Sequence, residues 1–234
     1  MIAAVINGAV IIVGALTGLF LGKRIPSRIT ETLTQMLALC VGVMGIMDAI
    51  QTGSIIHVMI CLILGTVIGE LLQIERGVDH MGARLRARFD KNSGSESTFT
   101  EGFLTASLLF CVGSMAILGS FDAGIRQDYS KILTKSLIDG VTAIGLAATL
   151  GSGVLFSGVM VLVYQGLLTL LSGVLAQYMD ALIITEMSAV GGVMLIGMAL
   201  NMLFPKQHIR LGNVIPAIFL PIVYFPLLQA LGWA

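Results

Sequence analysis

Eight stretches of this sequence, each about 20 residues long, carry almost no charged side chains. An α-helix needs about 20 apolar residues to cross the roughly 30 Å hydrocarbon core of a bilayer. Charged residues make up only 11% of the chain, whereas a soluble globular protein contains about 25%. The sequence therefore predicts an all-α protein, a polytopic membrane helix bundle with about eight transmembrane helices. The predicted spans are 2–22, 31–50, 54–74, 102–121, 131–151, 153–177, 182–204 and 211–231.

These spans fill most of residues 1–234, so we expect a single integral membrane domain without a separate soluble core. The longest polar stretch, 75–100, is expected to be an amphipathic segment on the cytoplasmic side. The apolar residues of its first part recur at spacings that place them on one helix face: Ile74, Val78, Met81, Leu85 and Phe89. A basic helix of this kind can lie on an anionic membrane surface or can simply cap the bundle, and both interpretations stay open.

Lys and Arg residues are distributed unevenly between the predicted loops. The loops after the first, third and seventh spans contain 10 of the 13, and the loop after the fourth contains Arg126, Lys131 and Lys135. Because cytoplasmic loops are enriched in Lys and Arg, this pattern predicts a multi-pass protein with both termini outside. Lys23 and Arg24 follow the first apolar run. We therefore expect that run to be a retained span and not a cleaved signal peptide.

Short sequence echoes relate the first part of the chain to the last part. Gly42–Met44 matches Gly192–Met194, and His57–Gln73 aligns without gaps on Asn213–Gln229. These echoes relate the first three spans to the last three in the same order. Matching spans are separated by an odd number of crossings, so they run in opposite directions. This arrangement predicts an inverted repeat, which is common in secondary transporters.

Asp139 is the acidic residue that lies deepest in a predicted span. It is about seven residues into the fifth span, which is roughly 10 Å at about 1.5 Å per residue. Ser136 and Thr142, three residues to either side, share its helix face. An ionisable residue at this depth needs a partner or a function. Asp139 therefore binds an ion or solute, or it packs against a neighbouring helix. From the sequence alone, Asp139→Asn is expected to keep the fold and abolish transport, because the amide preserves shape and hydrogen bonding.

Glu186 is the second acidic candidate, about one turn into the seventh span. With the orientation above, it shares the outer half of the membrane with Asp139. Two carboxylates that face one cavity can bind a cation or exchange a proton. Alternatively, Glu186 reaches the lipid headgroups. Four amide side chains complete the candidate substrate-binding or ion-binding residues, where they line a path or bridge helices. They are Gln165, Asn201, Gln35 and Asn7. Asp48 and Glu70 lie near span ends, where a side chain can reach water, so they rank lower.

Motifs of common enzymes are absent from the sequence. It contains no phosphate-binding loop, no H-E-x-x-H and no G-x-S-x-G. The cysteines Cys40, Cys61 and Cys111 all fall within predicted spans and lack the spacing of metal ligands. We therefore expect a protein that is not an enzyme and that needs no cofactor, while a metal substrate stays open.

Five segments distributed over the whole chain carry a resemblance to a known family. They are Ile6-Asn7, Arg24–Arg28, Leu64–Glu70, Lys135–Asp139 and Ser188–Gly192. These segments resemble the bacterial YdfK/YqgA-type inner-membrane proteins of unknown function. The resemblance implies a location in the bacterial inner membrane and supplies no established activity.

Two segments also show a fainter similarity to MntP-type manganese exporters and LysE-like transporters. They are Ser136–Asp139 and Gly191–Gly197, with one extra residue between Ser-Leu and Asp. This similarity implies cation export. Taken together, the sequence predicts a secondary transporter or exporter of a small solute or a divalent cation. The alternatives are a channel and a non-transporting membrane scaffold or sensor. The expected partners are membrane lipids and the small-molecule or ion substrate. No nucleic-acid partner is expected, and the sequence is compatible with a homo-oligomer.

Overall fold

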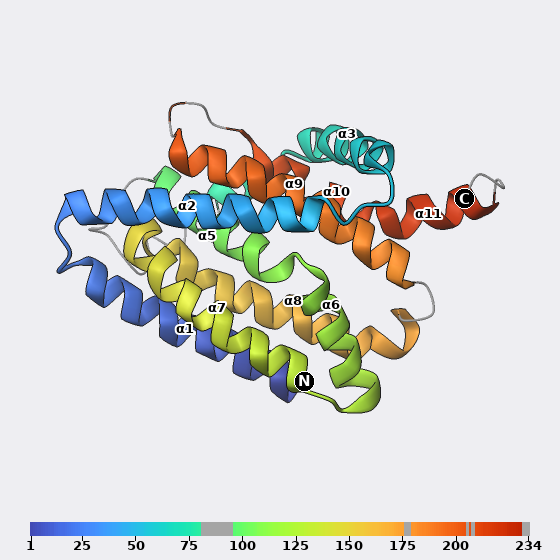
Figure 1. Cartoon of the computed structure of the whole chain (residues 1–234), viewed down its shortest axis with the longest axis horizontal. Helices are drawn as coiled ribbons and strands as arrows, with labels where there is room; N and C mark the ends of the chain where they lie inside the picture. The colour runs from blue at the N-terminus through green and yellow to red at the C-terminus, as the bar shows by residue number, and fades with distance from the viewer. Residues whose placement is uncertain (81–95, 176–178, 205, 207–208, 231–234) are drawn as a thin grey trace.

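The structure, a computed structural model, describes residues 1–80, 96–175, 179–204, 206 and 209–230. Within these ranges it contains helices and no strand, so the predicted all-α bundle is confirmed (Figure 1). The long helices are α1 (Ile2–Gly22), α2 (Ser27–Ala49), α3 (Ile55–Leu72), α5 (Glu96–Cys111), α7 (Ser130–Leu150), α8 (Gly153–Leu175) and α9 (Ala181–Leu203). The shorter ones are α6 (Ser114–Phe121), the π-helical turn η1 (Asp122–Arg126), the 3-10 turn η2 (Leu211–Val214), α10 (Pro216–Phe219) and α11 (Pro221–Ala230).

Six of these helices are long and apolar enough to cross a membrane, and the number rises to eight if each of two bent pairs is one span. The bent pairs fall at the fourth and eighth predicted spans. The expected amphipathic segment is covered only in part. Residues 74–80 are helical, whereas Met81, Leu85 and Phe89 lie outside the described residues. α5 already begins at Glu96, inside the stretch that the sequence assigned to this segment.

The fourth span is broken, which the sequence analysis did not predict. α5 and α6 are inclined by 57° to each other. The break lies at Gly113, whose φ of 103° is a backbone conformation that residues with a side chain rarely adopt. A polar backbone at this depth is tolerated where it is buried in protein or lines a cavity.

The eighth span is broken at proline, as its three prolines indicate. The pair formed by residues 211–219 and 221–228 is bent by 41°. Pro216 stands at the first turn of α10 and Pro221 begins α11. Proline lacks a backbone N–H donor and clashes with the preceding turn, so it starts helices well and interrupts them in the middle.

Small residues allow α1 and α7 to pack with their backbones in contact. A Cβ atom on Gly14 would collide with the carbonyl oxygen of Gly140, and one on Gly18 would collide with that of Ile144. Gly22 likewise approaches Ala148. Because both residue numbers rise together, α1 and α7 run parallel. Small residues four apart are the usual basis of close helix packing in membranes, where burial of apolar surface drives association only weakly.

Three other helix pairs run antiparallel. Gly8 of α1 meets Gly158 of α8, and Met1 lies beside Gly166. In α2 and α9, Gly42 approaches Ala199 while Ala49 approaches Gly192. In the third pair, Gly65 and Gly69 of α3 contact Ala217 and Asn213, respectively. Figure 1 shows the last two pairs beside each other above the layer of α1, α7 and α8.

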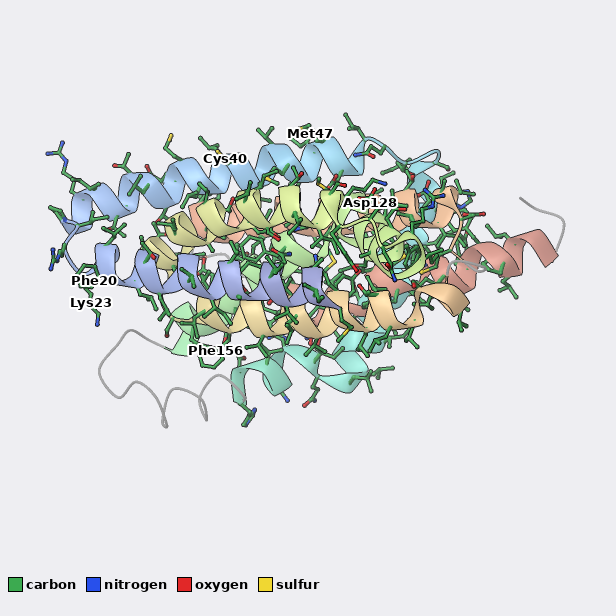
Figure 2. The ribbon with its side chains drawn as sticks, turned by 90° about the horizontal axis from the view of Figure 1, so that it is seen from below. Phe20, Lys23, Cys40, Met47, Asp128 and Phe156 are labelled. Carbon is green, nitrogen blue, oxygen red and sulfur yellow. The ribbon has the colours of Figure 1, made fainter. Side chains whose placement is uncertain are left out.

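Burial differs strongly between the helices. In the most apolar 18-residue window of α9, 67% of the residues are buried, compared with 17% in α2. α9 is therefore a central helix, and much of α2 faces outward, as the Cys40 and Met47 side chains do in Figure 2. The same view places Phe20 and Lys23 toward one end of the bundle and Asp128 toward the other.

Candidate functional site

Asp139 forms an ion pair with Lys135, one turn earlier on α7. The Lys135 ammonium donates to Asp139 Oδ2, and both side chains are buried, with exposed fractions of 8% and 6%. Lys135 was expected in a loop outside the membrane, and this expectation is wrong because Lys135 lies within the buried part of α7. The Lys135 ammonium also lies 5.8 Å from the centre of the Phe110 ring, a favourable position for a cation.

Two amides from other helices extend this ion pair into a buried network. The Asn7 side chain on α1 donates to Asp139 Oδ2 at 3.2 Å and to Gln165 Oε1 on α8 at 3.0 Å. Asn7 and Gln165 are fully buried, and Asn7 Oδ1 and Gln165 Nε2 have no hydrogen-bond partner among the residues that the structure describes. Three of the predicted site residues, Asp139, Asn7 and Gln165, are thus brought together from α7, α1 and α8.

A cavity of about 190 Å³ opens beside the ion pair, and we call it the α5–α6 cavity. Its charged lining residues are Asp48, Lys135 and Asp139, and Gly113 lines it at the break between α5 and α6. Seven of its twelve lining residues are apolar, among them Phe110 and Met115. The break in the fourth span, two carboxylates and one ammonium group therefore all border the same cavity.

Ser136 and Thr142 share the side of α7 that carries Asp139, as their spacing predicted. Thr142 lines the α5–α6 cavity, and its hydroxyl donates to the backbone oxygen of Ile138. Ser136 is buried and donates to the backbone oxygen of Ile132. Both hydroxyl hydrogens are thus used within the helix, and each oxygen keeps acceptor capacity for a further donor.

Glu186 is buried at a different place and does not line the α5–α6 cavity. Its Oε2 accepts a hydrogen bond from the Thr52 hydroxyl at 2.7 Å, and its Oε1 accepts one from the Gly53 backbone N–H at 2.9 Å. Both donors belong to the connection between α2 and α3. Among the described residues, Asp139 lines the α5–α6 cavity and Glu186 does not, so this cavity is not the common one that was expected. The alternative of an interfacial Glu186 is not met either, since its exposed fraction is only 1%.

The remaining two amides lie away from this network. Asn201 at the end of α9 forms two hydrogen bonds with the backbone of Ile209, at 2.9 Å and 2.8 Å. It thereby holds the connection that leads to η2. Gln35 lies on the exposed side of α2. Neither residue contacts Asp139 in the described structure, and a role in binding stays a prediction for both.

Sequence reasoning missed Lys135 and ranked Asp48 low. A Lys four residues before an Asp on a predicted helix is a recognisable signal for an ion pair, and it was available here. Asp48 looked like a residue at a span end, where a side chain can reach water. Its proximity to Asp139 depends on how α2 packs, for which the sequence gives no signal.

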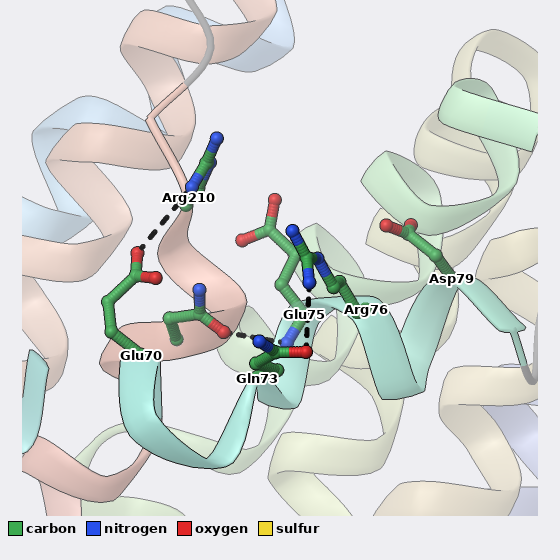
Figure 3. A pocket seen from close by; sticks show the side chains of 7 residues that line it. Glu70, Gln73, Glu75, Arg76, Asp79 and Arg210 are labelled. Atoms are coloured by element: carbon green, nitrogen blue, oxygen red, sulfur yellow. Dashed lines mark hydrogen bonds and ion pairs between the residues drawn. The ribbon is translucent and has the colours of Figure 1, made fainter. Parts of the chain in front are cut away.

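A second hollow, of about 320 Å³, lies beyond the end of α3 (Figure 3). It is lined by Glu70, Gln73, Glu75, Arg76, Asp79, Arg210 and Asn213. Glu75 holds its rim together, because its backbone N–H donates to Asn213 Oδ1 at 2.8 Å and its carboxylate accepts from Gly212 at 3.0 Å. Among the residues that the structure describes, no group of three His, Cys, Asp or Glu side chains is placed to hold a metal ion.

Comparisons with known proteins identify the chain by family and not by activity. It is 29% identical to the uncharacterized membrane protein YdfK of Bacillus subtilis (strain 168), with 99% of each chain covered. It is 26% identical to the uncharacterized protein YqgA of Escherichia coli (strain K12), with 94% of each covered. No solved structure matches this chain. The family described as "Protein of unknown function (DUF554)" matches residues 2–226, so this membrane protein belongs to the DUF554 family, which includes the predicted YdfK/YqgA type.

Proposed function

We propose that this protein is a secondary transporter or exporter that moves a small solute or a cation across the bacterial inner membrane, and that it is not an enzyme. One observation carries the proposal. A buried ion pair, Lys135–Asp139, borders a cavity at the point where a membrane span is broken. The similarity to a relative described as a membrane protein supports the location in a membrane.

The energetics favour a functional pair over a purely structural one. Each charge removed from water costs several kcal/mol, and mutual attraction recovers this only when geometry and further hydrogen bonds are favourable. Well-packed apolar residues would hold α7 in place at least as well. Here the pair instead borders open space, and Asn7 and Gln165 each keep one polar atom without a hydrogen-bond partner within the described part of the chain. Such an arrangement leaves Asp139 able to exchange one partner for another.

The helix pairing supports an inverted repeat. Any two antiparallel helices are related by a local two-fold axis. The sequence echoes also predict the position of that axis, because residues that are aligned in the two helices must exchange places across the contact. The alignment of Gly42 on Gly192 places Ala49 on Ala199, and the observed contacts are Gly42–Ala199 and Ala49–Gly192.

The second alignment behaves in the same way. It places Gly69 on Phe225 and His57 on Asn213, and the contacts are Gly69–Asn213 and His57–Phe225, the latter with ring centres 5.1 Å apart. Two independent echoes thus each agree with an observed helix crossing. Inverted repeats provide two related conformations, which is the basis of alternating access.

Both termini lie outside in the proposed orientation. Burial of Lys135 removes one basic residue from the outer loop, which strengthens the asymmetry of Lys and Arg. In an otherwise cysteine-free protein, a cysteine at Ser95 or Gln207 should react with an impermeant maleimide only from the cytoplasm. One at Gln127 should react from outside. Labelling of Ser95→Cys from outside in intact cells would contradict this orientation and indicate the opposite one.

The proposed transport is tested with purified protein in liposomes. A panel of amines, amino acids, monovalent cations and divalent cations is supplied on one side, and saturable uptake of at least one member is expected. Exchange against unlabelled solute on the opposite side distinguishes a carrier from a channel, which gives conductance without saturation. Uptake equal to that of empty liposomes for every member would contradict the proposal and favour a scaffold or sensor.

A further inference from the structure

The charges around the α5–α6 cavity do not balance. Asp139 is paired with Lys135, but Asp48 forms no ion pair among the described residues. Its Oδ1 accepts one hydrogen bond, from the Gln51 amide at 3.3 Å. Its Oδ2 faces Gly113, where an added Cβ would lie 3.7 Å away. With all three side chains ionised, the lining therefore carries one negative charge in excess.

We propose that the α5–α6 cavity binds a small organic cation of single positive charge, with Asp48 as the residue that selects it. This inference rests on the proposed function and specifies its substrate class. A monovalent cation makes the cavity neutral. A divalent cation would leave one positive charge in excess beside Lys135, and a neutral solute or an anion would leave negative charge unbalanced. Asp139 and Lys135 are buried and Asp48 is half-buried, so an unbalanced charge beside them is unfavourable and charge balance contributes to the selection.

Size and lining favour an organic ion over a bare metal ion. The volume of about 190 Å³ corresponds to roughly six water molecules at about 30 Å³ each. Most of the lining is apolar, which suits the carbon skeleton of an organic ion. A hard metal ion instead prefers a shell of six or more oxygen ligands. An organic ammonium ion can place its charged group beside Asp48 and its carbon skeleton against the apolar residues of the cavity.

The break between α5 and α6 explains how Asp48 reaches the cavity. Gly113 has no side chain, so the carboxylate on α2 faces the interrupted backbone directly. A continuous helix at this point would fill the space with side chains of the next turn. Asp48 is thus a specificity-determining residue that acts together with Gly113.

The test measures binding to the purified, detergent-solubilised protein, separately from transport. The probe is n-butylammonium, with 1-butanol as its neutral counterpart and Na⁺ and Mn²⁺ as competitors. We expect saturable binding of n-butylammonium, no binding of 1-butanol, and weak competition by both metal ions. Asp48→Asn should weaken n-butylammonium binding about tenfold or more, since hydrogen bonds to charged groups contribute about 1.5–3 kcal/mol.

Two further variants make the result interpretable. Asp48→Glu keeps the charge and should retain most of the binding, which excludes a general loss of folding. Asp128→Asn makes the same chemical change on an exposed residue outside the cavity and should bind as the wild type does. Unchanged binding in Asp48→Asn, or preferential binding of Mn²⁺, would overturn the inference and leave the proposed transport intact. Binding of n-butylammonium without transport of any solute would contradict the proposed function and leave the binding site in place.

Discussion

Asp139 and Glu186 are both buried carboxylates near the beginning of a membrane helix, yet their surroundings differ in kind. Asp139 is held by an ammonium group and an amide, beside a cavity. Glu186 is held by the hydroxyl of Thr52 and the N–H of Gly53, and it fastens the connection between α2 and α3. Burial of an acid in a membrane protein therefore does not by itself indicate its function. The charge of its partner and the space beside it are more informative.

The largest effect is expected for Asp139→Asn, because it leaves the Lys135 charge buried without a partner. Removing one member of a buried ion pair costs about 3–5 kcal/mol. The presence of Lys135 thus changes the expectation from the sequence, which was a fold of unchanged stability. Denaturant unfolding in detergent measures the loss.

The double variant Lys135→Gln with Asp139→Asn separates structure from function. It replaces the ion pair with two neutral amides and should regain most of the stability, while transport stays absent. A double variant that is stable and transports normally would show that the pair serves packing alone, and the contrast between Asp139 and Glu186 would disappear.

A smaller effect is expected for Glu186→Gln. Both neighbours of this side chain, the Thr52 hydroxyl and the Gly53 N–H, are donors, whereas the amide of glutamine has only one acceptor oxygen. One hydrogen bond is therefore lost, at a cost of about 1–3 kcal/mol. Unfolding should show this loss, whereas the transport rate per folded molecule should stay close to that of the wild type. Thr52→Ala removes one donor and is the matched change on the other side of the contact. Loss of transport at unchanged stability would place Glu186 in the transport site after all.

Gly113→Ala and Gly151→Ala compare two positive-φ glycines, with φ of 103° and 80°. Each substitution should destabilise the protein by about 1–2 kcal/mol, because a Cβ is disfavoured in such backbone conformations. Only Gly113 borders the α5–α6 cavity, so only Gly113→Ala should also reduce transport. Equal transport in the two variants would mean that the break in the fourth span has no special role.

The smallest effect concerns Asp128, an exposed carboxylate that serves as a reference in water. The hydrogen bond from the Ser130 hydroxyl, and after it that from the Ser130 N–H, lowers the pKa of Asp128 below its ordinary 3.8. The associated stabilisation is therefore present above the ordinary value and is lost as the pH falls through the lowered pKa.

Ser130→Ala removes the larger of these two causes. The pKa of Asp128 should rise toward its ordinary value, as a carboxyl ¹³C NMR titration can measure, and stability at neutral pH should stay close to that of the wild type because the group is exposed. A large loss of stability in Ser130→Ala would mean that losing a hydrogen bond is costly even at an exposed carboxylate. The cost expected for Glu186→Gln would then not depend on burial.

The long helices were predictable because each satisfies its own backbone hydrogen bonds in lipid and must therefore be apolar over its whole length. The break at Gly113 was not, since the chain contains 28 glycines and the sequence does not tell which adopts a positive φ. Asp139 was identified from its depth in a span. Asn7 and Gln165 were identified as amides, but only the packing of α1 against α7 and α8 lets Asn7 donate both to Asp139 and to Gln165. Asp48 was ranked below Glu186 for the cavity, because the position of Asp48 depends on the packing of α2, a helix that is mostly exposed, and because the two hydrogen-bond donors of Glu186 lie in the connection after α2.

The close contact of α1 with α7 has a consequence for biogenesis. Asn7 meets Asp139 only after 132 further residues have been synthesised. Until then α1 resides in the bilayer with its polar amide and its row of glycines facing lipid or another temporary neighbour. The network around Asp139 can therefore form only once α7 and α8 have been inserted, and maturation must include a late step in which α1 is recruited to them. Truncation before α8 should leave a chain that is inserted but is recognised by quality-control proteases.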